Sequence, residues 1–308
     1  MIVPAAMAYP WQTRTDWWVL GIAIAVVLLT FAGWRGLFLT TMIRRRFAVW
    51  RRNHARSRSR VRPEPSNRVT VLLRVEAPDG AVLPLTLVAG YVDRFGIRAS
   101  KVRVTSRDVD GTRTTWVGMT LGAADNLAAL QARSPEIPLY DTAEIVGRRL
   151  ADHLREAGLD AAIVDTVHGP LTTRGHESWR AVRDDHEQVA GYLAAYRIPV
   201  DERLGERLAE VWSQSSRETW TALELGGTAH APTVVAVCAF RTDEAPSKPP
   251  LAGLQKRGGL QRPLLTALDP RAVDRLDADA VRLPHGVLDG VAWQAEMAKS
   301  PLFEQTHL

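Results

Sequence analysis

The chain has 308 residues, a net charge of +5 and a sequence pI of about 9.7. Its single cysteine, Cys238, excludes an internal disulfide and suits a reducing compartment. The first 62 residues hold 11 Lys and Arg and one acid, so residues 63–308 sum to −5 (28 basic against 33 acidic). A duplex-binding domain needs positive charge on its folded surface, so this distribution argues against nucleic acid as a partner.

An apolar segment runs from Trp17 to Trp34 without a charge and continues past Arg35 to Ile43. A helix rises about 1.5 Å per residue, so roughly 20 such residues cross a hydrocarbon core about 30 Å thick. We therefore predict that residues 1–43 comprise an N-terminal stub and a transmembrane helix. The alternatives are a buried core helix, which the uncharged length disfavours, and a signal peptide, whose basic end would precede the apolar run.

Basic residues follow this segment in residues 44–66, an arginine-rich collar and linker without Asp or Glu before position 63. Positive charge close to a span is retained on the cytoplasmic side, so we expect the body to be cytoplasmic. Anionic lipid headgroups attract such residues. The arginines predicted to contact headgroups are Arg35, Arg44, Arg45, Arg46, Arg51 and Arg52.

Small residues recur within the apolar segment at steps of 4, 7 and 4, namely Gly21, Ala25, Ala32 and Gly36. This spacing places them on one helix face, where a second membrane helix can approach closely. The alternative is that Ala and Gly are simply common in spans.

The remaining residues alternate between strand and helix patterns. The expected strands are 68–75, 101–106, 113–121, 159–164, 189–200, 218–225 and 233–241, and the expected helices are 83–95, 123–132, 141–157, one after Asp201, and 264–268. Asp110-Gly111 marks a hairpin turn. Asp141 and Glu144 have the spacing of a capping box, and Val146, Leu150 and Leu154 form the apolar stripe of that helix.

The order β-α-β-β-α occurs twice, which suggests two subdomains, residues 67–167 and 168–308, the second with a Pro- and Gly-rich loop at 245–263. The predicted fold class is α+β, with mostly antiparallel sheets and helices on one face.

The sequence has no constellation that predicts catalysis, and we assign no catalytic, cofactor-binding or metal-binding residue and no small-molecule substrate. The loop 174–187, with His176, Asp184 and His186, supports an alternative hypothesis of a membrane-tethered enzyme or a protein that binds a lipid-linked substrate. Consecutive charged residues cannot all converge on one metal ion, so a solvated loop is the simpler interpretation.

Several stretches together resemble the EccE family, the smaller membrane-core subunit of the mycobacterial type VII (ESX) secretion system. These stretches are WRGLFLTT (34–41), TTWVGMTL (114–121), NLAALQARSPEIPL (126–139), RRLADHLREAG (148–158), ETWTALEL (218–225) and VVAVCAFRT (234–242). The resemblance implies a non-enzymatic subunit that holds an inner-membrane secretion complex together, with the EccC ATPase, EccD and EccB as partners. Members usually carry two transmembrane helices, whereas here the first is absent or reduced to residues 1–9.

Overall fold

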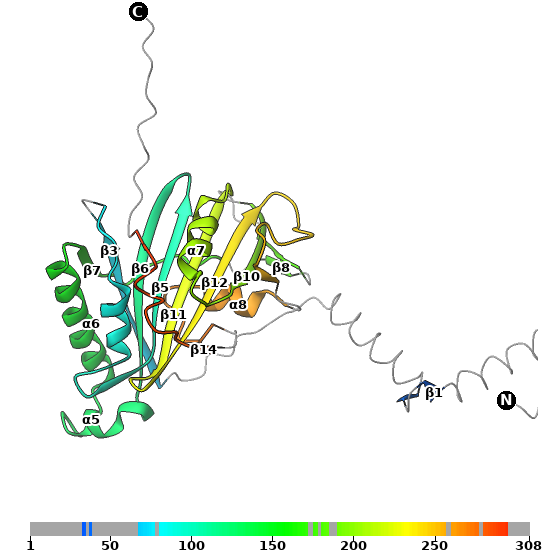
Figure 1. Ribbon diagram of the computed structural model, residues 1–308. Helices are drawn as coiled ribbons and strands as arrows, with labels where there is room; N and C mark the ends of the chain where they lie inside the picture. The colour runs from blue at the N-terminus through cyan, green and yellow to red at the C-terminus, as the bar shows by residue number, and fades with distance from the viewer. Residues whose placement is uncertain are drawn as a thin grey trace, which may run out of the picture. The chain divides into compact units, whose positions relative to one another are not determined.

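The computed structural model describes residues 33–34, 37–38, 67–77, 80–171, 175–177, 180–184, 190–256, 260–276 and 280–294. The chain divides into two compact units, residues 1–55 and residues 56–308. The second unit is built on one sheet with helices on both faces (Figure 1). The fold is thus mixed α and β with a mostly antiparallel sheet, as the sequence predicts.

The strands of this unit pair antiparallel throughout its described part. They are β3 (Arg68–Glu76), β4 (Asp93–Arg94), β5 (Ile97–Val109), β6 (Thr112–Gly122), β7 (Asp160–Ile163), β8 (Gly175–Glu177), β9 (Val182–Asp184), β10 (Gly191–Ile198), β11 (Glu218–Thr228), β12 (Ala231–Thr242), β13 (Gln255–Lys256) and β14 (Val281–Arg282). The order across the sheet is β7-β3-β6-β5-β11-β12-β10-β9-β8, with β4 on β5, β13 on β10 and β14 on β12.

The helices follow the predicted order with changed boundaries. They are α4 (Leu85–Ala89), α5 (Leu127–Gln131), α6 (Leu139–Glu156), α7 (Leu204–Ser213) and α8 (Arg262–Ala267), with the short 3-10 helices η1 (Gly90–Val92) and η2 (Ala124–Asn126). The helix predicted for residues 83–95 is only α4 and η1, because β4 and a tight turn follow. The Asp141–Glu144 capping box is wrong: α6 begins two residues earlier, after Pro138, without a side-chain cap.

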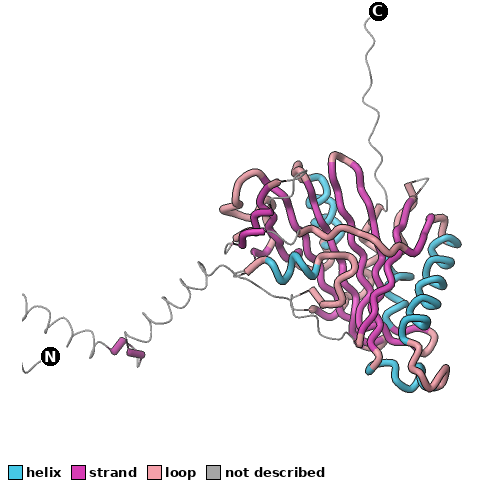
Figure 2. Tube along the Cα trace, turned by 180° about the vertical axis from the view of Figure 1, so that it is seen from behind, coloured by secondary structure: helices cyan, strands magenta, loops and turns pink. Residues whose placement is uncertain are grey.

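Alternation along the strands gives the sheet two buried faces. The first face carries Val102, Val104 and Leu223 and is covered by α4, α6 and α7, while the second carries Trp220 and Val237 and is covered by α8. Figure 2, seen from behind, shows α8 in front of the strands. The expectation that helices cover one face only is therefore wrong. The charged residues of β5 and β11 lie on the second face and are buried beneath α8 and the segment that follows it.

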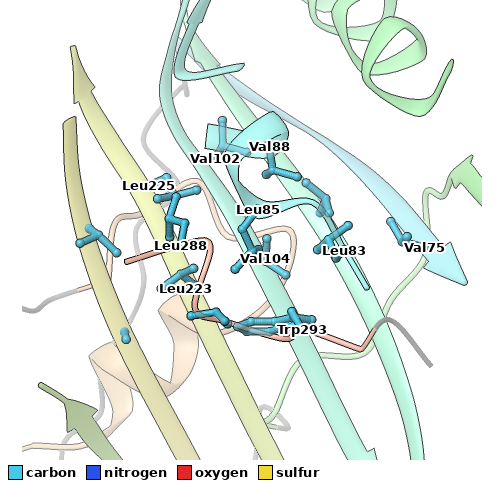
Figure 3. Close-up of a cluster of buried hydrophobic side chains, with 14 of the residues drawn as sticks. Val75, Leu83, Leu85, Val88, Val102, Val104, Leu223, Leu225, Leu288 and Trp293 are labelled. Carbon is cyan, nitrogen blue, oxygen red and sulfur yellow. The ribbon is translucent and has the colours of Figure 1, made fainter. Parts of the chain in front are cut away.

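The C-terminal described segment, residues 287–294, completes the first face. Figure 3 shows Leu288 and Trp293 beside Val104 and Leu223 at the centre of this core. Trp293 is fully buried, its Nε1–H donates to Ser106 Oγ at 2.8 Å, and its carbonyl accepts from the Leu83 N–H at 2.8 Å. Residues that are distant in sequence thus hold this segment against the sheet.

The strands of the two predicted subdomains lie in one sheet, which is continuous from β5 to β11. The division at residue 167 therefore separates two halves of that sheet, and their independence as folding units stays a prediction.

The first unit contains a two-residue antiparallel pair, β1 (Gly33–Trp34) with β2 (Leu37–Phe38). At these four residues the structure differs from the continuous helix that the apolar pattern predicts. Arg35 and Gly36 interrupt that pattern, and Gly is a poor helix former. The rest of the predicted span lies outside the described residues, and none of the helices within the described ranges is long and apolar enough to cross a membrane.

Candidate functional site

The ten residues predicted from the sequence for helix packing and lipid contact all lie outside the described residues, so both assignments stay predictions. They are Gly21, Ala25, Ala32 and Gly36 for helix packing and Arg35, Arg44, Arg45, Arg46, Arg51 and Arg52 for lipid contact. The structure does show charged clusters that the sequence did not predict, on the second face of the sheet.

The first cluster joins β5 to β11. Arg103 and Glu224 are cross-strand partners, and the Arg103 guanidinium donates to Glu224 Oε2 from Nη2 at 2.7 Å and from Nε at 3.1 Å. Both side chains are only 1% exposed. Arg275 adds a second cation, with Nε 3.3 Å from Glu224 Oε1. Removing a charge from such a buried set leaves its partner uncompensated, which costs more than the pair itself contributes.

The same cations bind the backbone of the segment after α8. Arg103 donates to the carbonyls of Ala267, Asp269 and Asp274, and Lys101 Nζ donates to those of Ala272 and Asp274. Ala267 is the last residue of α8, and cations are favourable at a helix C-terminus because its carbonyls carry partial negative charge. Residues 262–276, called the α8 segment below, are thus held to the sheet by two buried cations.

Burial alters the acid–base properties of these groups. Desolvation, with a smaller contribution from Arg103, lowers the pKa of Lys101 to about 7, while Glu224 and Asp274 act in the opposite direction. A lysine of this kind can serve as a proton acceptor in an enzyme. Here two main-chain carbonyls engage its ammonium, so the geometry fits an anchor of the α8 segment.

A second cluster forms a row of alternating charges across four strands. Arg107 of β5 lies 2.6 Å from Glu218 of β11, Glu218 lies 2.6 Å from Arg241 of β12, and Arg241 lies 3.4 Å from Asp184 of β9. Glu218, Arg241 and Asp184 are at most 4% exposed. The row thus connects β5 to β9, the neighbour of the edge strand β8.

Two tryptophans lie between the clusters. Trp116 of β6 pairs with Thr105, which is between Arg103 and Arg107 along β5, and its ring stacks on Trp220 at 6.0 Å and 15°. The Arg107 guanidinium lies 5.6 Å from the Trp220 ring. This aromatic layer separates the two charged groups and shields them from water.

Two of the three residues of the enzyme hypothesis, Asp184 and His176, are described by the structure, and their side chains differ in environment. Asp184 is buried against Arg241, His176 is exposed on β8, and His186 lies outside the described residues. Groups of three or more His, Cys, Asp or Glu that could hold a metal ion do not occur in the described ranges. Cys238 is fully buried, and burial raises the pKa of its thiol, which disfavours the reactive thiolate.

A shallow groove of about 730 Å³ lies between α4 and residues 282–289. Ala89, Pro232 and Leu288 form its apolar wall, and Arg282 and His285 its polar rim. Two of its polar side chains are engaged with each other, because Thr86 Oγ1 donates to Asp289 Oδ1 at 2.8 Å.

Sequence reasoning missed Lys101, Arg103, Glu218 and Glu224 as functional positions. Arg103 and Glu224 each lie between two apolar residues of their strand, a pattern typical of a sheet with one solvent-exposed face. The signal that identifies them is opposite charge at cross-strand partners such as Arg103 and Glu224, and the pairing register is needed to read it.

Comparison with known proteins decides the family. Residues 109–198 match the EccE family model, whose description assigns it to the type VII ESX secretion system translocon. The chain is 49% identical over 296 residues to the ESX-3 secretion system protein EccE3 of Mycolicibacterium smegmatis, covering 96% of this chain and 93% of that protein. It is 45% identical over 306 residues to EccE3 of Mycobacterium tuberculosis strains CDC 1551 and H37Rv, covering 96% of this chain and 90% of each protein.

The chain belongs to the EccE family. The matched residues span β6 to β10, which include Trp116 of the aromatic layer and Asp184 of the charged row. The EccE resemblance found in the sequence is thereby confirmed, and its relatives are named as components of a type VII secretion system.

Proposed function

We propose that this EccE-family chain is a structural, non-enzymatic subunit of an inner-membrane type VII (ESX) secretion complex. It would anchor through residues 17–43, dock its arginine collar on anionic lipids, and present its body on the cytoplasmic side. Its partners would be the EccC ATPase, EccD and EccB. The observation that carries the proposal is the likeness to EccE3 proteins over 96% of the chain.

The chemistry of the body supports a structural role. The buried charges of the second face are used for internal contacts, either with one another or with carbonyls of the α8 segment. Groups engaged in this way hold strands and segments together, and they are not presented to a substrate.

The test is purification of the tagged full-length chain from native membranes in mild detergent. We expect co-purification with a large ATPase and a multi-span membrane subunit, identified by mass spectrometry. A chain that runs alone under conditions in which other subunits stay associated would overturn the proposal. Alanine substitution of His176, Asp184 and His186 tests the enzyme hypothesis. If these variants lose a catalytic turnover while the complex stays assembled, that hypothesis is favoured.

Orientation is tested separately by protease added to sealed cells. We expect the body to be protected until the membrane is opened. Digestion of residues 67–294 in intact cells would place the body on the opposite side from the one proposed.

A further inference from the structure

A strained aromatic turn lies between β4 and β5. Phe95 and Gly96 are the two central residues of the hairpin, with φ of 57° and 72°. Hairpins with both central φ values positive favour Asn-Gly, Asp-Gly or Gly-Gly, and a bulky L-residue in this region costs about 1 kcal/mol. Phe95 is nevertheless 49% exposed, so burial of its ring explains only part of its presence.

One side of the Phe95 ring is fixed by neighbouring rings. Its centroid lies 6.3 Å from that of Tyr91 and 6.4 Å from that of His153, and Tyr91 Oη and His153 Nδ1 are hydrogen-bonded at 2.6 Å. The Tyr91 and His153 side chains therefore hold the turn against α6.

Two arginines flank the same ring. The Cζ atoms of Arg94 and Arg149 lie 5.1 Å and 5.0 Å from the Phe95 centroid. Ile145, one helical turn before Arg149, is 42% exposed, so the apolar surface extends along α6. We call Arg94, Phe95, Ile145 and Arg149 the Phe95 surface.

The two arginines of this surface have no acidic partner among the described residues. In the part of the chain that the structure describes, neither Arg94 nor Arg149 forms an ion pair, although other arginines of α6 do. Arg148 pairs with Glu144 at 2.6 Å, and Arg155 pairs with Asp152 at 2.7 Å. Arg94 and Arg149 are thus left available for a ligand with negative charge.

We propose that the Phe95 surface docks a segment of another protein subunit that carries a carboxylate next to an apolar side chain. The carboxylate pairs with the two guanidinium groups, and the apolar side chain packs on Phe95 and Ile145. Guanidinium and carboxylate geometries match, and Arg and aromatic residues are enriched at interfaces and their hot spots. The proposal rests on the proposed function of the chain as a subunit of a complex.

A lipid surface fits the Phe95 surface less well than a protein segment does. Each basic residue near an anionic membrane contributes about 1 kcal/mol, and lipid recognition usually takes clusters of about 4–8. The Phe95 surface has two arginines, on a body whose sequence sums to −5. A protein segment gains directed pairing from the same two groups and needs no larger cluster.

The experiment places a photo-crosslinking benzoyl-phenylalanine at position 145 of the full-length chain in native membranes. We expect one dominant product with a peptide of another subunit that contains Asp or Glu next to an apolar residue. Phe95→Asn, which suits the turn, and Arg149→Ala should each lower its yield by at least about fivefold, equivalent to about 1 kcal/mol. Arg148→Ala is the matched control, because Arg148 is already paired with Glu144, and should leave the yield unchanged.

The outcomes separate this inference from the proposed function. If the wild-type chain retains its partner subunits but the crosslink is insensitive to Phe95→Asn and Arg149→Ala, the inference is wrong and the proposed function stands. A product formed with lipid also overturns it. If wild-type protein retains no other subunit, the proposed function itself fails. If the melting temperature of Phe95→Asn equals or exceeds that of wild type, the variant is folded. A lost crosslink in this variant then reports the loss of docking.

Discussion

Val104 of β5 pairs with Leu223 of β11, and each lies five positions before the last paired residue of its own hairpin strand, Val109 and Thr228. The two residues are therefore equivalent positions of two hairpins, β5–β6 and β11–β12, that meet along their first strands. An approximate two-fold axis passes between them.

The outer strands obey the same symmetry. β3 pairs with β6, and β10 pairs with β12. The three strands of one half therefore have the order β3-β6-β5, and the equivalent strands of the other half have the order β10-β12-β11. The repeat of β-α-β-β-α in the sequence corresponds to this arrangement. The charged residues do not follow it, because Arg103 and Glu224 are cross-strand partners at non-equivalent positions.

Replacing Glu224 by Gln should destabilise the body strongly. The change leaves Arg103 buried without its counter-charge and replaces one of the two carboxylate oxygens, which accept from Arg103, Arg275 and the Leu276 N–H, by an NH2 donor. We expect a loss of about 3 kcal/mol or more in the free energy of unfolding. Thermal unfolding of the full-length protein in detergent measures it, with Glu144→Gln, in an exposed pair, as control. Equal melting temperatures for the two variants would contradict the role assigned to the cluster.

Lys101 should make stability depend on pH in the alkaline range. Its folded pKa of about 7 lies below the ordinary value of 10.5, so between these pH values the unfolded state binds more protons. The contribution of this residue to the free energy of unfolding therefore rises with pH across that window, by up to about 1.4 kcal/mol per unit.

Wild type and Lys101→Met can be compared by denaturant unfolding at pH 7.5 and pH 9. We expect the stability of wild type relative to the variant to increase over this range. Lys248→Met, at an exposed position, controls for general effects of charge. A stability difference that stays constant with pH would show that Lys101 does not titrate in this window.

Gly147→Ala should destabilise the protein even though Ala is the better helix former by about 1 kcal/mol. A Cβ at position 147 would lie 2.6 Å from Val71 Cγ1, and Val is stiff at this torsion. We expect a net loss of about 1–3 kcal/mol from overpacking between α6 and β3. The melting temperature reports it, and a variant more stable than wild type would show that α6 moves freely on the sheet.

Trp293→Ala should release the C-terminal segment. The substitution removes a fully buried ring and its hydrogen bond to Ser106, at a cost of about 3–5 kcal/mol. Hydrogen exchange should speed up at the Leu83 amide, which bonds to the Trp293 carbonyl. His285→Ala, at an exposed position just before this segment, should leave that amide protected. Unchanged exchange in the Trp293 variant would contradict the packing role.

The strands were predictable because the patterns that indicate them come from residues close together in the chain. Alternation and β-branched residues identified β3, β6 and β12, and Asp110-Gly111 identified the turn between β5 and β6. In α6, the predicted stripe of Val146, Leu150 and Leu154 is buried as expected, and the Glu144–Arg148 pair is present. These features depend on residues close in the chain.

The second face was not predictable, because its residues acquire their environment from distant segments. Lys101 and Arg103 lie at alternate positions of β5, as polar residues do on a solvent-exposed strand face. In the folded protein both are buried, and they donate to carbonyls of residues more than 160 positions later in the chain. The apolar periodicity predicts a helix that includes Phe95, whereas α4 ends at Ala89 and Phe95 lies in a turn. Periodicity does not reveal this turn, which Gly96 permits because glycine tolerates a positive φ.

The sequence by itself determined the family, the order of the elements and the separation of a basic N-terminal part from a mildly acidic body, since motif, periodicity and charge are properties of neighbouring residues. Only the tertiary structure decided which charges are buried and paired. Burial depends on which strands meet and on what covers them, and the α8 segment and residues 287–294 contact strand residues that are distant from them in the sequence.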